Sequence, residues 1–312
     1  MTTRLAVTLG DPRGIGPELV AATLGTDVVP ADVSFVVVGP SGAGIDVDVD
    51  VGPWEPGAGA AAAGRLAGRA IEAAVALALD GAVQGIVTAP LDKAALHAGG
   101  YDFPGHTEML GALTGTEPAM MLAATRPSVA GGTPLRVVLA TTHVALRDVP
   151  RLLTADAIAH AAALTRDHLQ RWFGIAAPRI ALCALNPHAG DGGRFGREDD
   201  ELLAPAARAA GLVGPLPADT VFVRAMRGAF DAVIAPYHDV GMTAIKVASF
   251  GHAVNVTLGL PFPRTSPDHG TALDIAGQGI ADPTSFGEAV RVCADIVERG
   301  AAARARLRET SA

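Results

Sequence analysis

Three histidines of this sequence stand in the same local context, and that context could build a metal site. His143 ends the run VVLATTH, His188 ends IALCALNPH and His238 ends AVIAPYH. Each run predicts an apolar strand that enters a polar turn, and ligands of open α/β sheets bind beyond the carboxyl ends of strands. Neutral imidazoles suit Zn²⁺, Co²⁺, Ni²⁺ or Fe²⁺. The alternative is three unrelated loop histidines, because separations of 45 and 50 residues match no local ligand motif.

Two aspartates could serve the same site. Asp239 directly follows His238, and Asp219 lies in the segment GPLPADT. Either carboxylate could orient a histidine, bind an ion or accept a proton as a base. The alternative for Asp219 is an ordinary turn or helix-capping aspartate.

A second group of residues predicts an anion site. Lys246, Asn255 and Arg264 follow one another at intervals of nine residues, and GHTE contributes His106 and Thr107. Cationic side chains bind phosphate or carboxylate strongly, and amide and hydroxyl groups add neutral donors. Without further support Lys246, Asn255 and Arg264 would be ordinary surface positions, and GHTE alone is a weak signal.

A glycine-rich turn follows the first apolar run. GDPRGIGPE places Gly10, Gly14 and Gly16 where a phosphate or cofactor loop would lead into a helix. The sequence contains neither G-x-G-x-x-G nor a Walker A motif, so a Rossmann cofactor site is not supported. A tight turn between a strand and a helix is the alternative.

Composition excludes several classes of protein. The net charge of −8 argues against nucleic acid as a partner. No window approaches about 18 uninterrupted apolar residues, so no membrane span is expected. The opening segment MTTRLAVTLGDP fits a first strand better than a signal peptide, which predicts a cytoplasmic protein. In that compartment Cys183 and Cys293 are expected to be buried free thiols, although a disulfide between them is possible in principle.

Strand-like and helix-like runs alternate along the chain, which predicts an α/β fold with a largely parallel sheet. Thr154 is a candidate helix N-cap and Gly174 a candidate C′ residue. Residues 45–64 are expected to form an irregular connection with a short edge strand, and residues 126–134 to mark the passage into a second domain. The predicted strands are 5–9, 33–38, 85–88, 135–142, 179–185 and 232–235, and the predicted helices are 65–79, 154–173 and 199–210.

One loop resembles a known cofactor-binding segment. SPDHGTALDIAG is similar to the adenosine-binding loop of the isocitrate and isopropylmalate dehydrogenase superfamily, with Leu273 in place of the usual proline. GIGPE matches the opening loop of the same superfamily. Within it, the chain resembles the 4-hydroxythreonine-4-phosphate dehydrogenases of vitamin B6 biosynthesis through VTAPLDK, GHTE, ATTHVALRD, LNPHAGDGG, GPLPADT, YHD and NVTLGLPFPR.

The resemblance implies a fold and roles for the residues. It implies two α/β/α domains with an active-site cleft between them, residues 1–125 plus 262–312 on the cofactor side and 126–261 on the metal, substrate and dimerisation side. It also implies a homodimer whose second subunit completes the site. The implied metal ligands are His143, His188 and His238; the substrate ligands are His106, Thr107, Lys246, Asn255 and Arg264; and the cofactor residues are Asp11, Gly14, Gly16, His269, Gly270, Asp274 and Ile275.

The implied activity is an oxidative decarboxylation. NAD⁺ would take hydride from 4-hydroxythreonine 4-phosphate, and loss of CO₂ from the 3-keto acid would leave 3-amino-2-oxopropyl phosphate. The implied metal is Zn²⁺, with Co²⁺, Mg²⁺ or Mn²⁺ as alternatives, and Asp274 suits NAD⁺ better than NADP⁺. Lys246, Asp239 and Asp219 are the candidate catalytic residues.

The substrate stays open, because Val240 replaces the glutamine of the family's YHDQG. D-Erythronate or D-threonate 4-phosphate and a cis-dihydrodiol carboxylate are alternative substrates. A non-catalytic metal- or nucleotide-binding relative and an acyl-transfer enzyme similar to phosphotransacylases are alternative functions.

Overall fold

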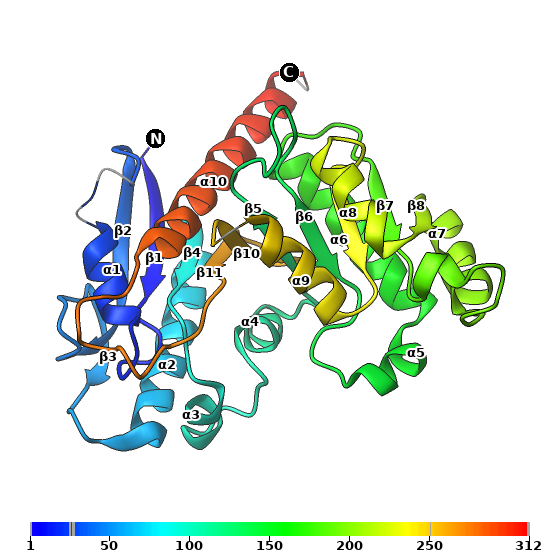
Figure 1. The fold of residues 1–312 in the computed structure, drawn as a ribbon. Helices are drawn as coiled ribbons and strands as arrows, with labels where there is room; N and C mark the ends of the chain where they lie inside the picture. Colours follow the sequence, from blue (N-terminus) through cyan, green and yellow to red (C-terminus); the bar gives the residue numbers. More distant parts are fainter. Residues whose placement is uncertain (1, 25, 27–28, 250, 311–312) are drawn as a thin grey trace. The chain divides into compact units, whose positions relative to one another are not determined.

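The chain folds into two compact units. The computed structural model describes residues 2–24, 26, 29–249 and 251–310 (Figure 1). Unit 1 comprises Met1–Pro118 and Val254–Ala312, and unit 2 comprises Ala119–Ala253. The passages between the units therefore follow residues 118 and 253, whereas the sequence placed them after residues 125 and 261. Residues 126–134 instead connect two antiparallel strands inside unit 2.

Unit 1 is built on a mixed sheet. Its strands lie in the order β3-β2-β1-β4-β11-β10, and all neighbours are parallel except β10 and β11. β1 and β4 are almost entirely buried, as expected of parallel strands covered on both faces. The strands are β1 (Thr3–Thr8), β2 (Val33–Ser41), β3 (Val49–Pro53), β4 (Gly85–Thr88), β10 (Ala253–Leu258) and β11 (Arg264–Pro267).

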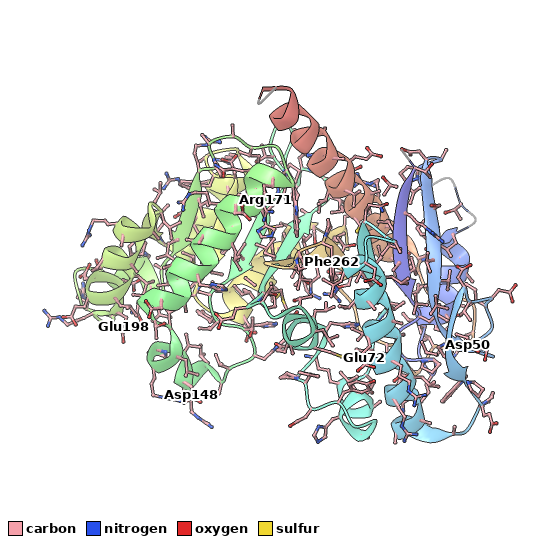
Figure 2. All side chains as sticks on the ribbon, turned by 180° about the vertical axis from the view of Figure 1, so that it is seen from behind. Asp50, Glu72, Asp148, Arg171, Glu198 and Phe262 are labelled. Atoms are coloured by element: carbon pink, nitrogen blue, oxygen red, sulfur yellow. The ribbon has the colours of Figure 1, made fainter. Side chains whose placement is uncertain are left out.

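Helices cover the sheet of unit 1. Ile71, Ala74 and Val75 on one face of α2 pack with Ile86 of β4 and with Phe262, which Figure 2 labels, in a single core cluster. The helices are α1 (Gly16–Leu24), α2 (Gly59–Leu79), α3 (Lys93–Ala98), α4 (His106–Thr114) and α10 (Thr284–Thr310).

Unit 2 contains the remaining strands of the mixed sheet. Its strands lie in the order β5-β6-β9-β7-β8, with only β5 and β6 antiparallel. β6, β9 and β7 are parallel neighbours, so their carboxyl ends lie at one edge of this sheet. The strands are β5 (Ala119–Ala124), β6 (Arg136–Leu139), β7 (Ile180–Cys183), β8 (Val213–Leu216) and β9 (Ala232–Ala235).

The helices of unit 2 bury apolar faces against this sheet. Val221 and Phe222 of α8 and Ile245 of α9 belong to one core cluster with Val137, Ala181 and Val233. The helices are α5 (Val149–Leu152), α6 (Ala155–Arg171), α7 (Ala204–Ala210), α8 (Ala218–Met226) and α9 (His238–Ser249). Three short helical segments are η1 (Leu146–Asp148), η2 (Pro187–Gly190) and the π-helical η3 (Asp199–Leu203).

The predicted elements agree with the structure where local signals are strong. Thr154 caps α6 by accepting a hydrogen bond of 3.1 Å from the Ala157 amide. Gly174 is left-handed with φ of 69°, but it lies one residue beyond the C′ position, because the C-cap of α6 is Trp172. The expected edge strand is β3, at the end of the strand order. The prediction of irregular structure up to residue 64 is wrong in part, because α2 begins at Gly59. Alanine favours helix, so the Ala-rich segment extends the helix toward its N-terminus.

Both cysteines lie in the interior of the protein. Cys183 and Cys293 are both buried free thiols, and burial raises the pKa of each to about 12. Within the described residues, no helix combines the length and hydrophobicity that crossing a membrane requires.

Candidate active site

His143 and His238 lie side by side in unit 2. β6 and β9 pair in parallel with Val137 opposite Val233, so the turns that follow the two strands begin at the same edge. The turns are joined by a hydrogen bond of 2.9 Å from the Ala140 amide to the Ala235 carbonyl and by one of 2.8 Å from Thr141 Oγ1 to the Pro236 carbonyl. The two imidazole rings are 5.6 Å apart between centroids and tilted by 42°.

Asp239 orients the His238 ring. His238 begins α9, and its Nδ1 lies 2.7 Å from Asp239 Oδ1. A carboxylate at this nitrogen favours the tautomer that carries its proton on Nδ1 and leaves the lone pair of Nε2 for a ligand. The Asp239 carboxylate therefore acts through His238 in this arrangement.

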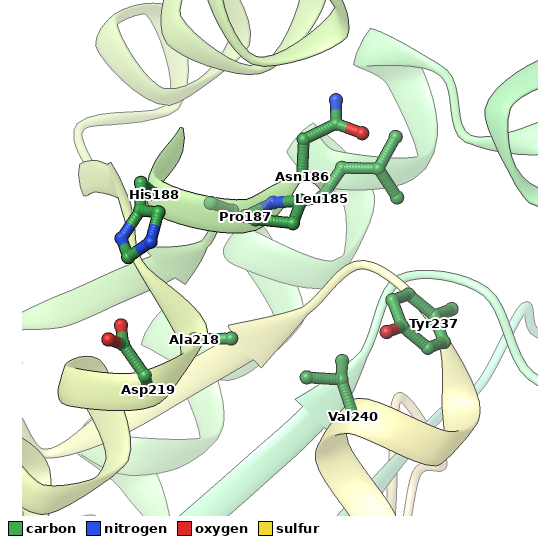
Figure 3. A pocket seen from close by; sticks show the side chains of 9 residues that line it. Leu185, Asn186, Pro187, His188, Ala218, Asp219, Tyr237 and Val240 are labelled. Carbon is green, nitrogen blue, oxygen red and sulfur yellow. The ribbon is translucent and has the colours of Figure 1, made fainter. Parts of the chain in front are cut away.

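His188 lines a pocket of about 330 Å³ in the same unit. Figure 3 shows its ring and the Asp219 carboxylate turned toward each other from opposite walls, with Val240 and Tyr237 nearby. The residues come from the ends of β7 and β9 and from the start of α8. The lining residues are Ala184, Leu185, Asn186, Pro187, His188, Ala218, Asp219, Tyr237 and Val240.

The three histidines do not form one closed group in this single chain. Among the described residues, no set of three or more His, Cys, Asp or Glu side chains is arranged to hold a metal ion. The structure therefore brings His143 and His238 together and places His188 with Asp219 in the pocket. The three-histidine metal site stays a prediction.

In unit 1 Arg264 is a buried cation with few partners. The side chain on β11 is 1% exposed, and its guanidinium donates to Thr257 Oγ1 at 3.1 Å and to Thr88 Oγ1. Its Nε is buried without a hydrogen-bond partner. Burial lowers the pKa of Arg264 to about 9, against the opposing influence of Cys293 and Glu108. A guanidinium in this environment is poised to bind an anion.

His106 stands beside this cation. Its pKa lies well below the ordinary value of 6.5, first because of burial and then because of the positive charges of Arg264 and Lys93. Its Nε2 is buried without a partner. His106 begins α4, a helix of nine residues whose first-turn amides face an anion favourably.

The remaining predicted substrate residues divide between the units. Thr107 follows His106 in the first turn of α4, and Asn255 on β10 points to the same sheet face as Thr257, with a buried Oδ1 that has no partner. We call His106, Thr107, Asn255 and Arg264 the Arg264 cluster. Lys246 lies on α9 of unit 2 and is exposed.

The GDPRGIGPE segment packs against the loop that contains Thr271. Asp11 is fully buried, and its carboxylate binds Arg13 at 2.7 and 3.0 Å. The Ile15 amide donates to the Thr271 carbonyl at 3.0 Å, and a Cβ on Gly14 would lie 2.8 Å from that oxygen. A Cβ on Gly16 would lie 2.1 Å from the Leu9 carbonyl. Gly14 and Gly16 thus permit close backbone packing, and Asp11 holds the Arg13 side chain in the same segment.

The loop that follows β11 presents the other predicted cofactor residues. His269, Gly270 and Asp274 are exposed, and Ile275 is half-buried. The loop is fastened to α1, because Glu18 Oε2 accepts a hydrogen bond of 3.1 Å from the Gly279 amide. The dinucleotide-binding role of this loop stays a prediction.

Sequence reasoning missed several residues that shape these groups. Lys93 lies in the quoted motif VTAPLDK and acts on His106, so its charge was a signal that could have been used. Thr88 and Thr257 also lie in quoted motifs, VTAPLDK and NVTLGLPFPR, but nothing in those motifs reveals which hydroxyl meets a distant arginine. Asp199 binds backbone amides 13 and 14 residues earlier, which no local motif encodes.

Comparison with known proteins gives full-length relatives. D-threonate 4-phosphate dehydrogenase of Cupriavidus necator is 43% identical, over 95% of this chain and 98% of that protein. 4-Hydroxythreonine-4-phosphate dehydrogenase of Geobacter metallireducens is 41% identical, over 94% of this chain and 95% of that protein. Both relatives are dehydrogenases, and this chain is an oxidoreductase of the same kind.

Solved structures agree with this relationship. The 4-hydroxythreonine-4-phosphate dehydrogenase of Klebsiella pneumoniae matches with a TM-score of 0.81 and 38% identity, over 95% of this chain and 98% of that one. An isocitrate dehydrogenase of Methylococcus capsulatus, with 16% identity and a TM-score of 0.54, confirms the expected fold class alone. The family described as pyridoxal phosphate biosynthetic protein PdxA matches residues 20–293, and the chain belongs to that family.

Proposed function

We propose that this protein oxidises 4-hydroxythreonine 4-phosphate at its secondary hydroxyl with NAD⁺, with the help of a divalent metal ion. The resulting 3-keto acid then loses CO₂ to give 3-amino-2-oxopropyl phosphate. The observation that carries the proposal is the Arg264 cluster, because a buried guanidinium with an unpartnered Nε beside a neutral histidine suits the phosphate that this substrate carries.

The phosphate is bound by complementary donors. Arg264 offers its guanidinium, and the neutral His106 can donate from Nε2 when its proton resides there. The Thr107 hydroxyl and the free amides in the first turn of α4 add neutral donors. A bound dianion would offset the cost of burying Arg264, since charge-assisted hydrogen bonds are the strong ones.

The residues of unit 2 fit a divalent metal ion. Two imidazoles with centroids 5.6 Å apart can ligate one ion from both sides, and Asp239 holds His238 in the tautomer that a ligand needs. His143, His238 and His188 would hold the ion. Zn²⁺ is the preferred metal, and Co²⁺, Mg²⁺ or Mn²⁺ are alternatives. When bound, it would act as a Lewis acid toward the hydroxyl and then the ketone.

The side chains near the histidines have separate tasks. Asp239 orients His238, and Asp219 lines the pocket across from His188, so we assign neither carboxylate to the substrate hydroxyl. Lys246, two helical turns after His238 on α9, is then the candidate that accepts the hydroxyl proton at Nζ. Replacing Lys246 with Met should lower kcat by about 10²- to 10⁴-fold, in the range typical of general acid–base residues.

We further propose that the enzyme works as a homodimer whose sites are shared. His188 lies in a pocket with Asp219 and is not part of a three-residue metal group within the described chain. A second copy that supplies His188 to the His143–His238 pair would complete three ligands by the same symmetric contact twice.

Turnover tests the proposal directly. Purified protein with NAD⁺ and Zn²⁺ should form NADH and release CO₂ from 4-hydroxythreonine 4-phosphate. Dialysis against a chelator should abolish the activity, and added Zn²⁺ or Co²⁺ should restore it. Full activity of the His188→Ala variant after chelation would rule out the metal.

D-Threonate 4-phosphate is a second candidate substrate, favoured by Val240. This side chain lines the pocket beside His188 and packs against the core, so it offers no hydrogen bond to a substituent on the substrate. An apolar wall disfavours a charged ammonium more strongly than a neutral hydroxyl. The ratio of kcat/KM for the two phosphorylated substrates decides between them, and Val240→Gln should move that ratio toward the amino acid.

A further inference from the structure

The loop that carries His188 has a costly backbone conformation. His188, Ala189 and Asp191 have positive φ angles of 54°, 55° and 46°, although none of them is glycine. L-residues avoid this left-handed region because Cβ approaches the backbone, and such conformations persist only where the surroundings hold them. Something in unit 2 must therefore fix this loop.

Asp199 binds the start of this loop through hydrogen bonds. Its side chain is fully buried at the first position of η3, and its Oδ1 accepts a hydrogen bond of 2.8 Å from the Leu185 amide. Its Oδ2 accepts one of 2.9 Å from the Asn186 amide. These two amides lie just beyond the end of β7, where the strand ladder no longer satisfies them. One carboxylate thus fixes the amides of the two residues that precede Pro187 and His188.

A second carboxylate holds the same place. Glu198, which Figure 2 labels, accepts a hydrogen bond of 2.9 Å from Asn186 Nδ2. Gly196 leaves room for this contact, because a Cβ there would lie 2.3 Å from Glu198 Oε2 and 2.8 Å from Asn186 Nδ2. The two neighbouring acids therefore clamp Asn186 through its backbone and its side chain.

We propose that Asp199 is a positioning residue for the reaction, which it serves by holding His188 at the wall of the pocket opposite Asp219. The inference rests on the proposed function, in which His188 is a metal ligand. Without the clamp, residues 188–191 can relax to ordinary φ values, and the imidazole then leaves the position from which it can bind. Because the Arg264 cluster lies in unit 1, recognition of the phosphate should not change.

The test compares Asp199→Asn with Glu201→Gln. Both changes remove one negative charge from η3 and keep the side-chain volume, but Glu201 is exposed and its carboxylate pairs with the Arg197 guanidinium at 3.1 Å. Hydrogen exchange of the peptide covering residues 184–196 should be at least about 10-fold faster in Asp199→Asn and unchanged in Glu201→Gln. Calorimetric titration with Zn²⁺ should show at least about 10-fold weaker binding, and kcat should fall while KM for the phosphorylated substrate stays the same.

Other outcomes are equally decisive. If Asp199→Asn does not fold, Glu198→Ala removes the second clamp from a half-buried position and should shift exchange and Zn²⁺ affinity in the same direction by about 3-fold. Wild-type Zn²⁺ affinity in a folded Asp199→Asn overturns the inference, whether or not the loop exchanges faster. If the wild-type protein itself binds no Zn²⁺, the proposed function fails, and unchanged loop exchange in Asp199→Asn would separately refute the clamp.

Discussion

His106 is a buried base whose charge responds to the groups around it. Because its pKa is depressed by burial and by Arg264 and Lys93, the imidazole is neutral at pH 7. The unfolded chain binds this proton more readily than the folded protein below pH 6.5. The free energy of unfolding is therefore not reduced by His106 above pH 6.5, and it decreases as the pH falls below that value.

A bound phosphate should reverse part of this depression. Two negative charges close to His106 favour the imidazolium, so its pKa should rise when inorganic phosphate is added. NMR titration of ¹⁵N-histidine-labelled protein, with and without phosphate, measures the shift. His160, on α6 of unit 2, is the internal control that should not move. An unchanged His106 titration in saturating phosphate would exclude this residue from the anion site.

For single residues, the sequence predicted which side chains lie close together better than it predicted the burial and charges around each side chain. The shared context of His143 and His238 was sufficient to place both after parallel strands, where their rings meet. The context could not reveal that Asp11 would bind Arg13, since a buried carboxylate and an exposed one look alike in sequence. The depressed pKa of His106 depends on Arg264, which lies 158 residues away in the chain.

Among the elements, α2 shows how small residues permit close packing. A Cβ on Gly64 would lie 1.8 Å from the Ala95 carbonyl of α3, and one on Gly68 would lie 2.0 Å from the Tyr101 ring. Tyr101 in turn donates to Glu72 Oε2 at 2.9 Å. The segment before α4 is thus fixed against α2 by two glycines and one hydrogen bond.

Gly64→Ala should therefore destabilise the protein, although alanine favours helix more than glycine does. The clash is with backbone, which cannot move aside cheaply, and overpacking of this kind costs about 3 kcal/mol. Urea unfolding measures the loss, with Arg65→Ala at the exposed neighbouring position as the control. A variant as stable as the wild type would mean that α2 and α3 can separate without penalty.

The exposed loop after β11 should determine the choice of dinucleotide. Asp274 is exposed, and a carboxylate there would accept from a ribose 2′-hydroxyl and repel a 2′-phosphate. We expect a higher kcat/KM with NAD⁺ than with NADP⁺, and Asp274→Ser should reduce the ratio by about 10-fold or more, as expected for one lost charged contact. Equal use of both cofactors by the wild-type protein would contradict this role.

Long elements with caps were predictable, and short elements fixed by pairing were not. The alternation and the Thr154 cap located α6, because both signals are local. β11 has the sequence RTSP, which no propensity assigns to a buried strand, and it exists because it pairs with β4 and β10. The Arg264 cluster depends on that strand, so its assembly could not be derived from periodicity.

For the whole molecule, a dimer whose active sites are shared between subunits should recover activity when two inactive variants are mixed. His143→Ala and His188→Ala should each be inactive alone. In a mixed dimer that shares ligands, one of the two sites combines an intact His143 with an intact His188. Because random pairing of an equal mixture makes about half of the dimers mixed, the mixture should recover roughly a quarter of wild-type activity. Unfolding and refolding the mixture allows exchange of subunits. No recovery in verified mixed dimers would mean that each chain supplies all three histidines itself.

Recognition of a phosphorylated hydroxy acid is the central claim, and the phosphate dependence of turnover tests it most directly. The measurement is kcat/KM for 4-hydroxythreonine 4-phosphate and for its dephosphorylated form, in the wild type and in Arg264→Met. The account predicts a preference for the phosphorylated substrate that Arg264→Met reduces by about 10²-fold or more, with no loss of thermal stability, because a buried cation is replaced by an apolar side chain. Equal rates with both substrates, or an unchanged preference in Arg264→Met, would contradict it.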